Sequence, residues 1–111
     1  MAQGGGSDST AGARAAASAV LARLRPLFDT AVQQVAGQCA VGGRLDAARL
    51  DAQQVVCHEL ALASADLLAA EIVVDGAVDA TPRDAGLALA FAVEAALAVI
   101  ARLETVAFET G

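Results

Sequence analysis

The chain has 111 residues and a formal net charge of −6, and 57% of its residues are hydrophobic, many of them alanine. Only 3% are aromatic, which is typical of closely packed helices and disfavours a β-sandwich. All seven basic residues are arginines scattered along the chain, so the sequence offers no basic patch for nucleic acid or for an anionic membrane surface.

The N-terminal residues have little to bury. Residues 1–12 are rich in Gly and Ser, and we expect a disordered tail there because glycine is entropically costly to order. Residues 13–111 are then a single helical domain, consistent with the length of the chain. Three long helices joined by short loops predict an all-α antiparallel bundle.

The first helix is predicted to run from the end of the tail to about Cys39. Pro26 removes one helical hydrogen bond, so this helix either kinks there or divides in two, which would give four helices. Gly42 and Gly43 are predicted to end the element in the left-handed conformation of a helix cap. The apolar positions recur at three- and four-residue steps and are Val20, Leu21, Leu24, Leu27, Phe28, Ala31, Val32 and Val35.

The second helix is predicted to begin after Asp46, whose carboxylate can accept a hydrogen bond from a first-turn amide. It continues to about Val74, before a stop at Asp75 and Gly76. Leu50, Cys57, Ser64 and Leu68 widen its apolar side, while Asp51, Gln54, His58 and Glu59 mark the wetter side of its first turns. The main apolar stripe is Val56, Leu60, Ala63, Leu67, Ala70 and Val74.

The third helix has the clearest start signal in the chain. Thr81 is predicted as its N-cap, and Pro82 takes the first helical position, where a missing N–H is harmless. Asp84 places a negative charge in the first turn, at the positive end of the helix dipole. The helix is expected to reach about Phe108. Its predicted buried side is Leu87, Phe91, Leu97, Ile100 and Leu103.

Small residues line two of the predicted helices at four-residue spacing, and they would let two backbones approach closely. These alanine stripes are Ala61–Ala65–Ala69 and Ala88–Ala92–Ala96. The third helix is apolar almost all round, which is typical of a helix buried on more than one side. Three helices cannot cover it completely, so we expect a further domain or a second copy of the chain to do so.

The apolar run from Ala85 to Ala101 raises the question of a membrane span. It is shorter than the roughly 20 residues that a spanning helix needs, and Glu94 interrupts it. A carboxylate at the bilayer centre costs about 2.5–3.5 kcal/mol on insertion scales. We therefore predict a core helix, no membrane partner and a cytoplasmic protein.

The sequence predicts no catalytic, cofactor-binding or metal-binding residues. His58 and Glu59 lack the second His four residues on that a zinc protease motif needs, since position 62 is Leu62. No Glu-x-x-His motif of a di-iron bundle occurs either. His58 is interpreted as a solvated or boundary residue. Glu94 lies within an apolar run and is the carboxylate with the most unusual surroundings. An ion pair with an arginine such as Arg102, or a polar neighbour, would explain a charge at this position.

The two cysteines leave two interpretations open. Cys39 and Cys57 are too few for a disulfide scaffold and belong to no Cys-x-x-Cys motif. The favoured interpretation is two small buried hydrophobic residues in a reducing compartment. The alternative is a redox pair.

Parts of the chain resemble helical segments of acyl-CoA dehydrogenases. The stretch from Gly43-Arg44-Leu45-Asp46 through Asp51 to Ala65 is similar to such segments, which often carry a "Q-V-x-x-x-x-L-A" pattern followed by alanine-rich helix. The order of three further segments is similar to the helical N-terminal extension of the 2-methylsuccinyl-CoA dehydrogenase type. Those segments are Leu24-Arg25-Pro26-Leu27, Gly43-Arg44-Leu45-Asp46 and Ala101-Arg102-Leu103-Glu104-Thr105-Val106.

The resemblance implies a parent enzyme that uses FAD to oxidise a branched acyl-CoA such as methylsuccinyl-CoA. The chain itself has no match to the flavin-binding strands or the catalytic base of that family, so it is expected to be an inactive fragment. Its partners would be the catalytic domains of the parent enzyme or a second copy of the chain. The alternative is a free-standing helical interaction protein that forms a homodimer.

Overall fold

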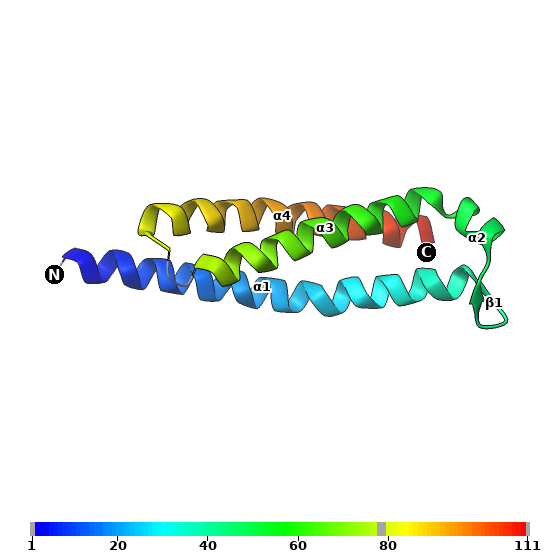
Figure 1. Ribbon diagram of the computed structural model, residues 1–111, viewed down its shortest axis with the longest axis horizontal. Helices are drawn as coiled ribbons and strands as arrows, with labels where there is room; N and C mark the ends of the chain where they lie inside the picture. The colour runs from blue at the N-terminus through cyan, green and yellow to red at the C-terminus, as the bar shows by residue number, and fades with distance from the viewer. Residues whose placement is uncertain (1, 78–79, 111) are drawn as a thin grey trace.

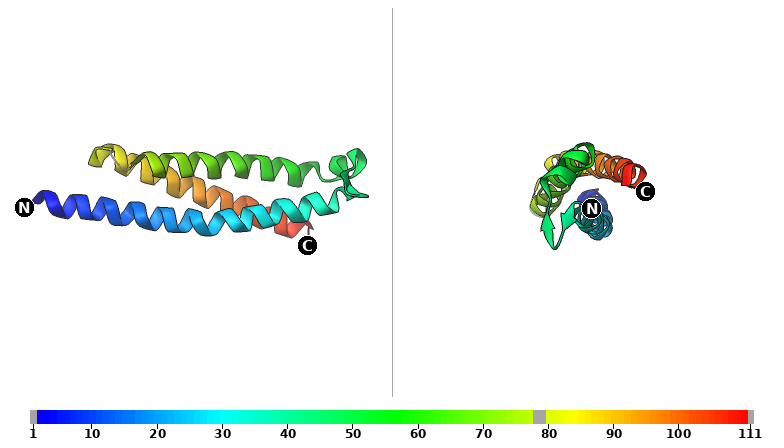
Figure 2. Two further views of the ribbon diagram at one scale, coloured as in Figure 1. Left: turned by 60° about the horizontal axis from the view of Figure 1, so that its bottom comes forward. Right: turned by 90° about the vertical axis from the view of Figure 1, so that its right-hand side faces the viewer.

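The computed structural model describes residues 2–77 and 80–110, with side chains described from residue 11 onward. Its elements are α1 (Ala2–Gln38), β1 (Ala40–Val41), β2 (Arg44–Leu45), α2 (Ala47–Ala52), α3 (Gln54–Gly76) and α4 (Pro82–Thr110). The chain direction reverses between α1 and α3 and again between α3 and α4 (Figure 1). The end-on view places these three helices around one axis (Figure 2). The predicted all-α antiparallel bundle of three long helices is confirmed.

The first helix is continuous through Pro26, so of the two alternatives the division into two helices is wrong, and the fourth helix is α2. Pro26 and Ala22 are both exposed. The carbonyl of Ala22, which loses its helical donor to the proline, therefore lies on the solvent side of α1 and can bond to water. A proline on this side breaks no contact in the core, and the helix continues past it.

The start of α1 lies within the stretch where a tail is expected. α1 begins at Ala2, and Figure 1 shows this end projecting beyond the start of α4. Met1 lies outside the described residues. The division of the chain into a tail of residues 1–12 and a bundle of residues 13–111 stays a prediction.

The sequence predicted that Gly42 and Gly43 cap the first helix. In the structure they form a hairpin turn instead. β1 and β2 pair antiparallel, with Val41 opposite Arg44. The two glycines between them have φ angles of 59° and 80°. Two positive φ angles in a two-residue loop define the turn whose twist matches that of paired strands. The hairpin reverses the chain at one end of the bundle.

The second predicted helix is divided in two at Gln53. Its start is confirmed, because the Asp46 carboxylate accepts a hydrogen bond of 3.1 Å from the Arg49 amide. Gln53, at φ −109° and ψ 25°, ends α2 and precedes α3. The side chains of Arg49 and Gln53 both reach back to Gln38 at the end of α1, at 3.3 and 3.5 Å. These long-range contacts fold α2 back onto α1, and local sequence spacing gave no sign of them.

The core of the bundle follows the predicted stripe of α3. All six residues of that stripe are buried, and Leu67, Val74 and Ala63 are at most 1% exposed. α1 contributes Leu21, Leu24, Phe28 and Val35 to the same cluster, and Cys39 joins it directly after the helix. The end of α3 is held by the Arg14 side chain, whose Nε donates to the Val74 carbonyl at 3.1 Å. The same carbonyl accepts from the Ala77 amide at the C-cap, so Arg14 adds a second donor from the neighbouring helix α1.

The predicted buried side of α4 is wrong. Leu87, Phe91, Leu97 and Ile100 are all exposed, and only Leu103 of the predicted set packs against the core. The side of α4 that faces α1 and α3 consists of Ala85, Ala92, Ala95, Ala96, Val99 and Val106. Of the two alanine stripes, Ala92 and Ala96 are in the core as predicted, whereas Ala61 and Ala65 on α3 are exposed. Small residues let α4 lie close to its neighbours, and its large apolar side chains then point outward.

The N-cap of α4 is as predicted, and it allows a first test. The Asp84 amide donates to Thr81 Oγ1 at 3.2 Å. Replacing Thr81 by Ala removes this acceptor and is expected to lower the free energy of unfolding by about 1 kcal/mol. Urea unfolding followed by circular dichroism measures the change. Thr105→Ala is the control, because Thr105 lies inside α4 and alanine is the better helix former; an equal loss there would contradict the capping role of Thr81.

Candidate functional site

The outer face of α4 is the most unusual surface among the described residues. We define it by its exposed large side chains, which are Leu87, Phe91, Val93, Leu97, Ile100 and Phe108. At 100° per residue these positions occupy about half of the helix circumference. The most exposed of them is Phe108, at 85%. Soluble monomers rarely present so continuous an apolar surface unless it binds something.

The same face carries carboxylates without an ion-pair partner among the described side chains. Glu94 and Glu104 are exposed on α4, and none of the ion pairs found among the described side chains includes either of them. The suggested partner of Glu94, Arg102, instead binds Glu59 and Asp66 on α3, at 3.0 and 3.5 Å. Glu94 therefore interrupts the outer face with a charge that the bundle itself does not neutralise.

By length and composition, α4 could also cross a membrane. Only 22% of its most apolar 18-residue segment is buried in the bundle. Such a helix is weak evidence for a membrane protein, because core helices of soluble proteins pass the same test. The sequence prediction of a core helix holds for the alanine side of α4 alone. Its other side is uncovered, which agrees with the expectation that three helices cannot enclose it.

Two groups of ion pairs fix the positions of the long helices. The Arg25 guanidinium on α1 donates two hydrogen bonds to the Glu71 carboxylate on α3. Nε lies 3.2 Å from Oε2, and a terminal guanidinium nitrogen binds Oε1. The hydrogen bond to Glu71 raises the pKa of Arg25, against the opposing effect of burial. Arg102 joins α4 to α3 through Glu59 and Asp66. Because these carboxylates already have partners, they serve the packing of the bundle and offer no free site for a substrate.

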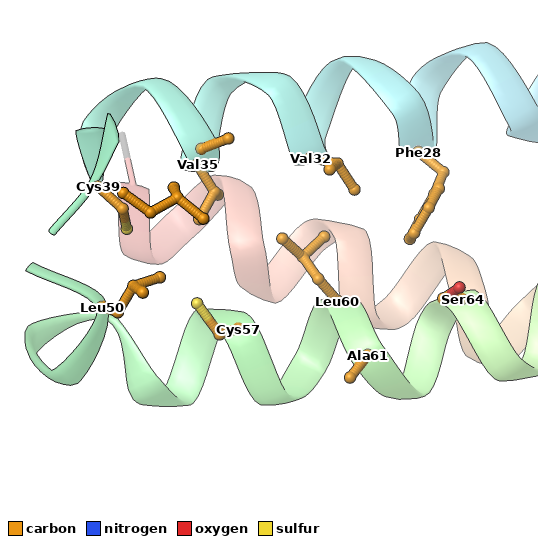
Figure 3. A pocket seen from close by; sticks show the side chains of 11 residues that line it. Phe28, Val32, Val35, Cys39, Leu50, Cys57, Leu60, Ala61 and Ser64 are labelled. Atoms are coloured by element: carbon orange, nitrogen blue, oxygen red, sulfur yellow. The ribbon is translucent and has the colours of Figure 1, made fainter. Parts of the chain in front are cut away.

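A groove of about 430 Å³ lies between α1 and α3, near the hairpin. Its lining is almost entirely apolar, and Figure 3 shows Phe28, Val32 and Leu60 along it, with Cys39 and Cys57 near one end. Ser64 supplies the one hydroxyl of the lining. The groove could accept an apolar side chain or ligand, but it holds no charged group that would orient a reacting substrate.

The two cysteines line this groove and are both free thiols. Cys39 is fully buried, and its Sγ lies 3.8 Å from the carbonyl oxygen of Arg49. Cys57 is half-buried. Burial raises the pKa of the Cys57 thiol, and the neighbouring Cys39 raises it further. A raised pKa keeps the thiol protonated and a poor nucleophile, so the arrangement agrees with the interpretation of small apolar residues and leaves the redox pair untested.

The raised pKa of Cys57 predicts slow alkylation. The pH midpoint for its reaction with iodoacetamide is expected above the ordinary value of about 8.5, because burial disfavours the thiolate. The folded chain holds this proton to higher pH than the unfolded chain does, so the contribution of this thiol to stability is lost as the pH rises through the alkaline range. Peptide mapping by mass spectrometry separates Cys57 from Cys39, and the urea-unfolded chain is the control. A midpoint at or below the ordinary value in the folded chain would contradict the prediction.

The remaining residues singled out from the sequence do not come together. His58 is exposed, as predicted, on the side of α3 away from the core. Glu94 lies on another helix and faces outward. Within residues 2–77 and 80–110, no group of three or more His, Cys, Asp or Glu side chains is placed to hold a metal ion. The feature that sequence analysis misplaced is the outer face of α4, whose large residues were assigned to the core.

Comparisons with known proteins add no family to these observations: no protein-family model matches the chain, and no curated protein matches it.

Proposed function

We propose that the chain is a non-catalytic helical module that acts by packing the outer face of α4 against another polypeptide. The observation that carries the proposal is the orientation of α4. Its alanines face the bundle, while large apolar residues such as Leu97 and Phe108 face outward. Covering these side chains removes apolar surface from water, which is the main driving force of protein association. The ion pairs within the bundle give the module a fixed shape on which this face is displayed.

The partner that the resemblance suggests is the catalytic part of an FAD-dependent acyl-CoA dehydrogenase-like enzyme that oxidises a branched acyl-CoA such as methylsuccinyl-CoA. In that case the flavin belongs to the parent enzyme, and no residue of this chain is proposed to hold it. The support is the set of similar segments, from Leu24-Arg25-Pro26-Leu27 to the end of α4. A cytoplasmic location is part of the same proposal, because Glu94 and the net charge of −6 both disfavour insertion into an anionic bilayer.

Photo-crosslinking in the native host tests the proposal. A photoreactive phenylalanine analogue is placed at Leu97 on the outer face of α4, and at Leu27 on α1 in the control. The two positions are matched, since their side chains are 61% and 60% exposed. We expect polypeptide adducts from position 97 in clear excess over position 27, and their masses identify the partner.

The possible adducts separate the alternatives. A flavoprotein dehydrogenase subunit in the adduct supports the enzyme module, and a second copy of the chain supports the free-standing interaction protein. Equal yields at the two positions, or adducts with lipid alone, would overturn the packing role of α4.

A further inference from the structure

We infer that the outer face of α4 is the interface of an antiparallel homodimer, in which it packs against the same face of a second copy of the chain. The inference rests on the proposed packing role of α4, and it assigns the face to a second copy of the chain, the partner of the free-standing alternative, in place of catalytic domains. Three properties of the face carry it: its area, the distribution of its charges, and the direction of the helix.

The area of the face is close to what a stable dimer needs. An aromatic side chain has roughly 150–250 Å² of surface and an aliphatic one somewhat less, and the six residues that define the face are between 38% and 85% exposed. Together they present on the order of 600 Å², already at the upper end of what a typical monomer exposes as one patch. The exposed alanines between them, Ala90 and Ala101, bring the face near the roughly 800 Å² per partner of a standard interface.

The shape of the face suits a helix partner. Positions 87, 90, 94, 97, 101, 104 and 108 are separated alternately by three and four residues, the spacing of a seam between two paired helices. Five of the seven residues at these positions are apolar. Ala90 and Ala101 let two such helices lie close together, and Leu87, Leu97 and Phe108 fill the space between them.

The charges of the face select the antiparallel arrangement. An in-register parallel pair would place Glu94 against Glu94 and Glu104 against Glu104, and like charges at such distances repel. In an antiparallel pair centred near Leu97, Arg83 at the start of one α4 lies close to the acidic end of the other, which carries Glu104 and Glu109. Arg83 is exposed and takes part in none of the ion pairs found among the described residues. The opposed dipoles of antiparallel helices add to the preference.

A membrane is the less suitable occupant of the same face. Inserting the face into a bilayer would bury the Glu94 carboxylate in hydrocarbon. In the dimer, Glu94 and Glu104 occupy seam positions, and the antiparallel order keeps the two copies of each residue from facing each other. The absence of lysine and the scattered arginines leave no basic cluster to attract anionic lipid head groups.

Sedimentation equilibrium of the full chain tests the inference. We expect a reversible monomer–dimer equilibrium, and Leu97→Glu should raise its dissociation constant at least tenfold. Leu27→Glu is the matched control on α1, with the same degree of exposure, and should change the constant by less than twofold. Far-UV circular dichroism of both variants checks that the bundle stays folded, which is expected because neither side chain is in the core.

The orientation is tested with single cysteines added to the chain. Leu97→Cys should give a covalent dimer with a short bis-maleimide, because this position lies near the centre of the pair. Leu87→Cys should not, since in an antiparallel pair the two copies of this residue are far apart. The unsubstituted chain measures the background from Cys39 and Cys57. Equal cross-linking at both positions would show a parallel pair and overturn the proposed arrangement.

The remaining outcomes also decide the question. A monomer at all concentrations, higher oligomers, or an equal effect of Leu27→Glu would overturn the homodimer. Co-sedimentation of a monomer with neutral phosphatidylcholine vesicles would assign the face to a membrane. A monomer that is still cross-linked to another polypeptide through position 97 in the native host would leave the proposed packing role standing with a different partner.

Discussion

Replacing Leu67 by Ala is expected to lower the free energy of unfolding by about 3–4 kcal/mol, within the range measured for buried leucines. Leu67 has no solvent exposure and lies in the middle of the buried stripe of α3. The cavity left by its side chain cannot close easily, because three helices meet there and their positions are fixed by the Arg25 and Arg102 ion pairs. Small domains are stable by only about 5–15 kcal/mol, so urea unfolding will show a large shift in midpoint.

The neighbouring leucine is the matched control. Leu68 is 53% exposed, and Leu68→Ala is expected to change the free energy of unfolding by about 0.5 kcal/mol or less, as surface substitutions usually do. The two variants have the same composition and the same helix propensity. Both are measured at one chain concentration, because association makes the apparent stability depend on it. Similar losses for the two variants would contradict the orientation of α3 in the bundle.

The orientation of α3 could be predicted because its large and its small apolar residues lie on the same side of the helix. Val56, Leu60 and Leu67 recur at helical spacing, and the polar residues Gln54 and Glu59 lie off their stripe. The caps at Asp46 and Thr81 could also be predicted. In each, the capping side chain accepts a hydrogen bond from the backbone amide three residues later. These features are local, and helical periodicity captures them.

The orientation of α4 could not be predicted in this way. Ranking residues by hydrophobicity places Leu87, Phe91 and Leu97 in the core, because burying them yields the most transfer free energy. In the bundle the short distance between helices decides instead: the fully buried residues of α4 are all alanine or valine, and Leu103 is only partly buried. The break at Gln53 was missed for a related reason. It depends on contacts with Gln38, fifteen residues away along the chain, and no local pattern reports them.

The consequence for the candidate site is direct. Sequence analysis recognised that α4 is too apolar for three helices to enclose, but it assigned the uncovered residues to the wrong side. The exposed side holds the large side chains, and only the three-dimensional arrangement reveals this. The same arrangement changes the interpretation of Glu94. It is one of the exposed carboxylates on the outer face and is not a partner of Arg102, which binds Glu59 and Asp66.

Replacing Ala63 by Leu is the second change with a large expected effect, about 3 kcal/mol of destabilisation from overpacking. Ala63 has no solvent exposure and lies in the same core stripe as Leu67. Three additional carbon atoms there must either push α4 away or force side chains out of their preferred rotamers. Urea unfolding measures the loss, and it should be accompanied by a weaker Arg102–Glu59 contact, because that ion pair depends on the distance between α3 and α4.

Ala65→Leu separates this effect from helix propensity. Ala65 is exposed and belongs to the alanine stripe that the sequence suggested as a contact surface. The same substitution there is expected to change stability by about 0.5 kcal/mol or less, because leucine is nearly as good a helix former as alanine. If Ala65→Leu were the more damaging variant, the stripe with Ala61 and Ala69 would be the true contact surface of α3. The large side chains of α4 would then have room inside the bundle, and the case for an outward-facing interface would fail with it.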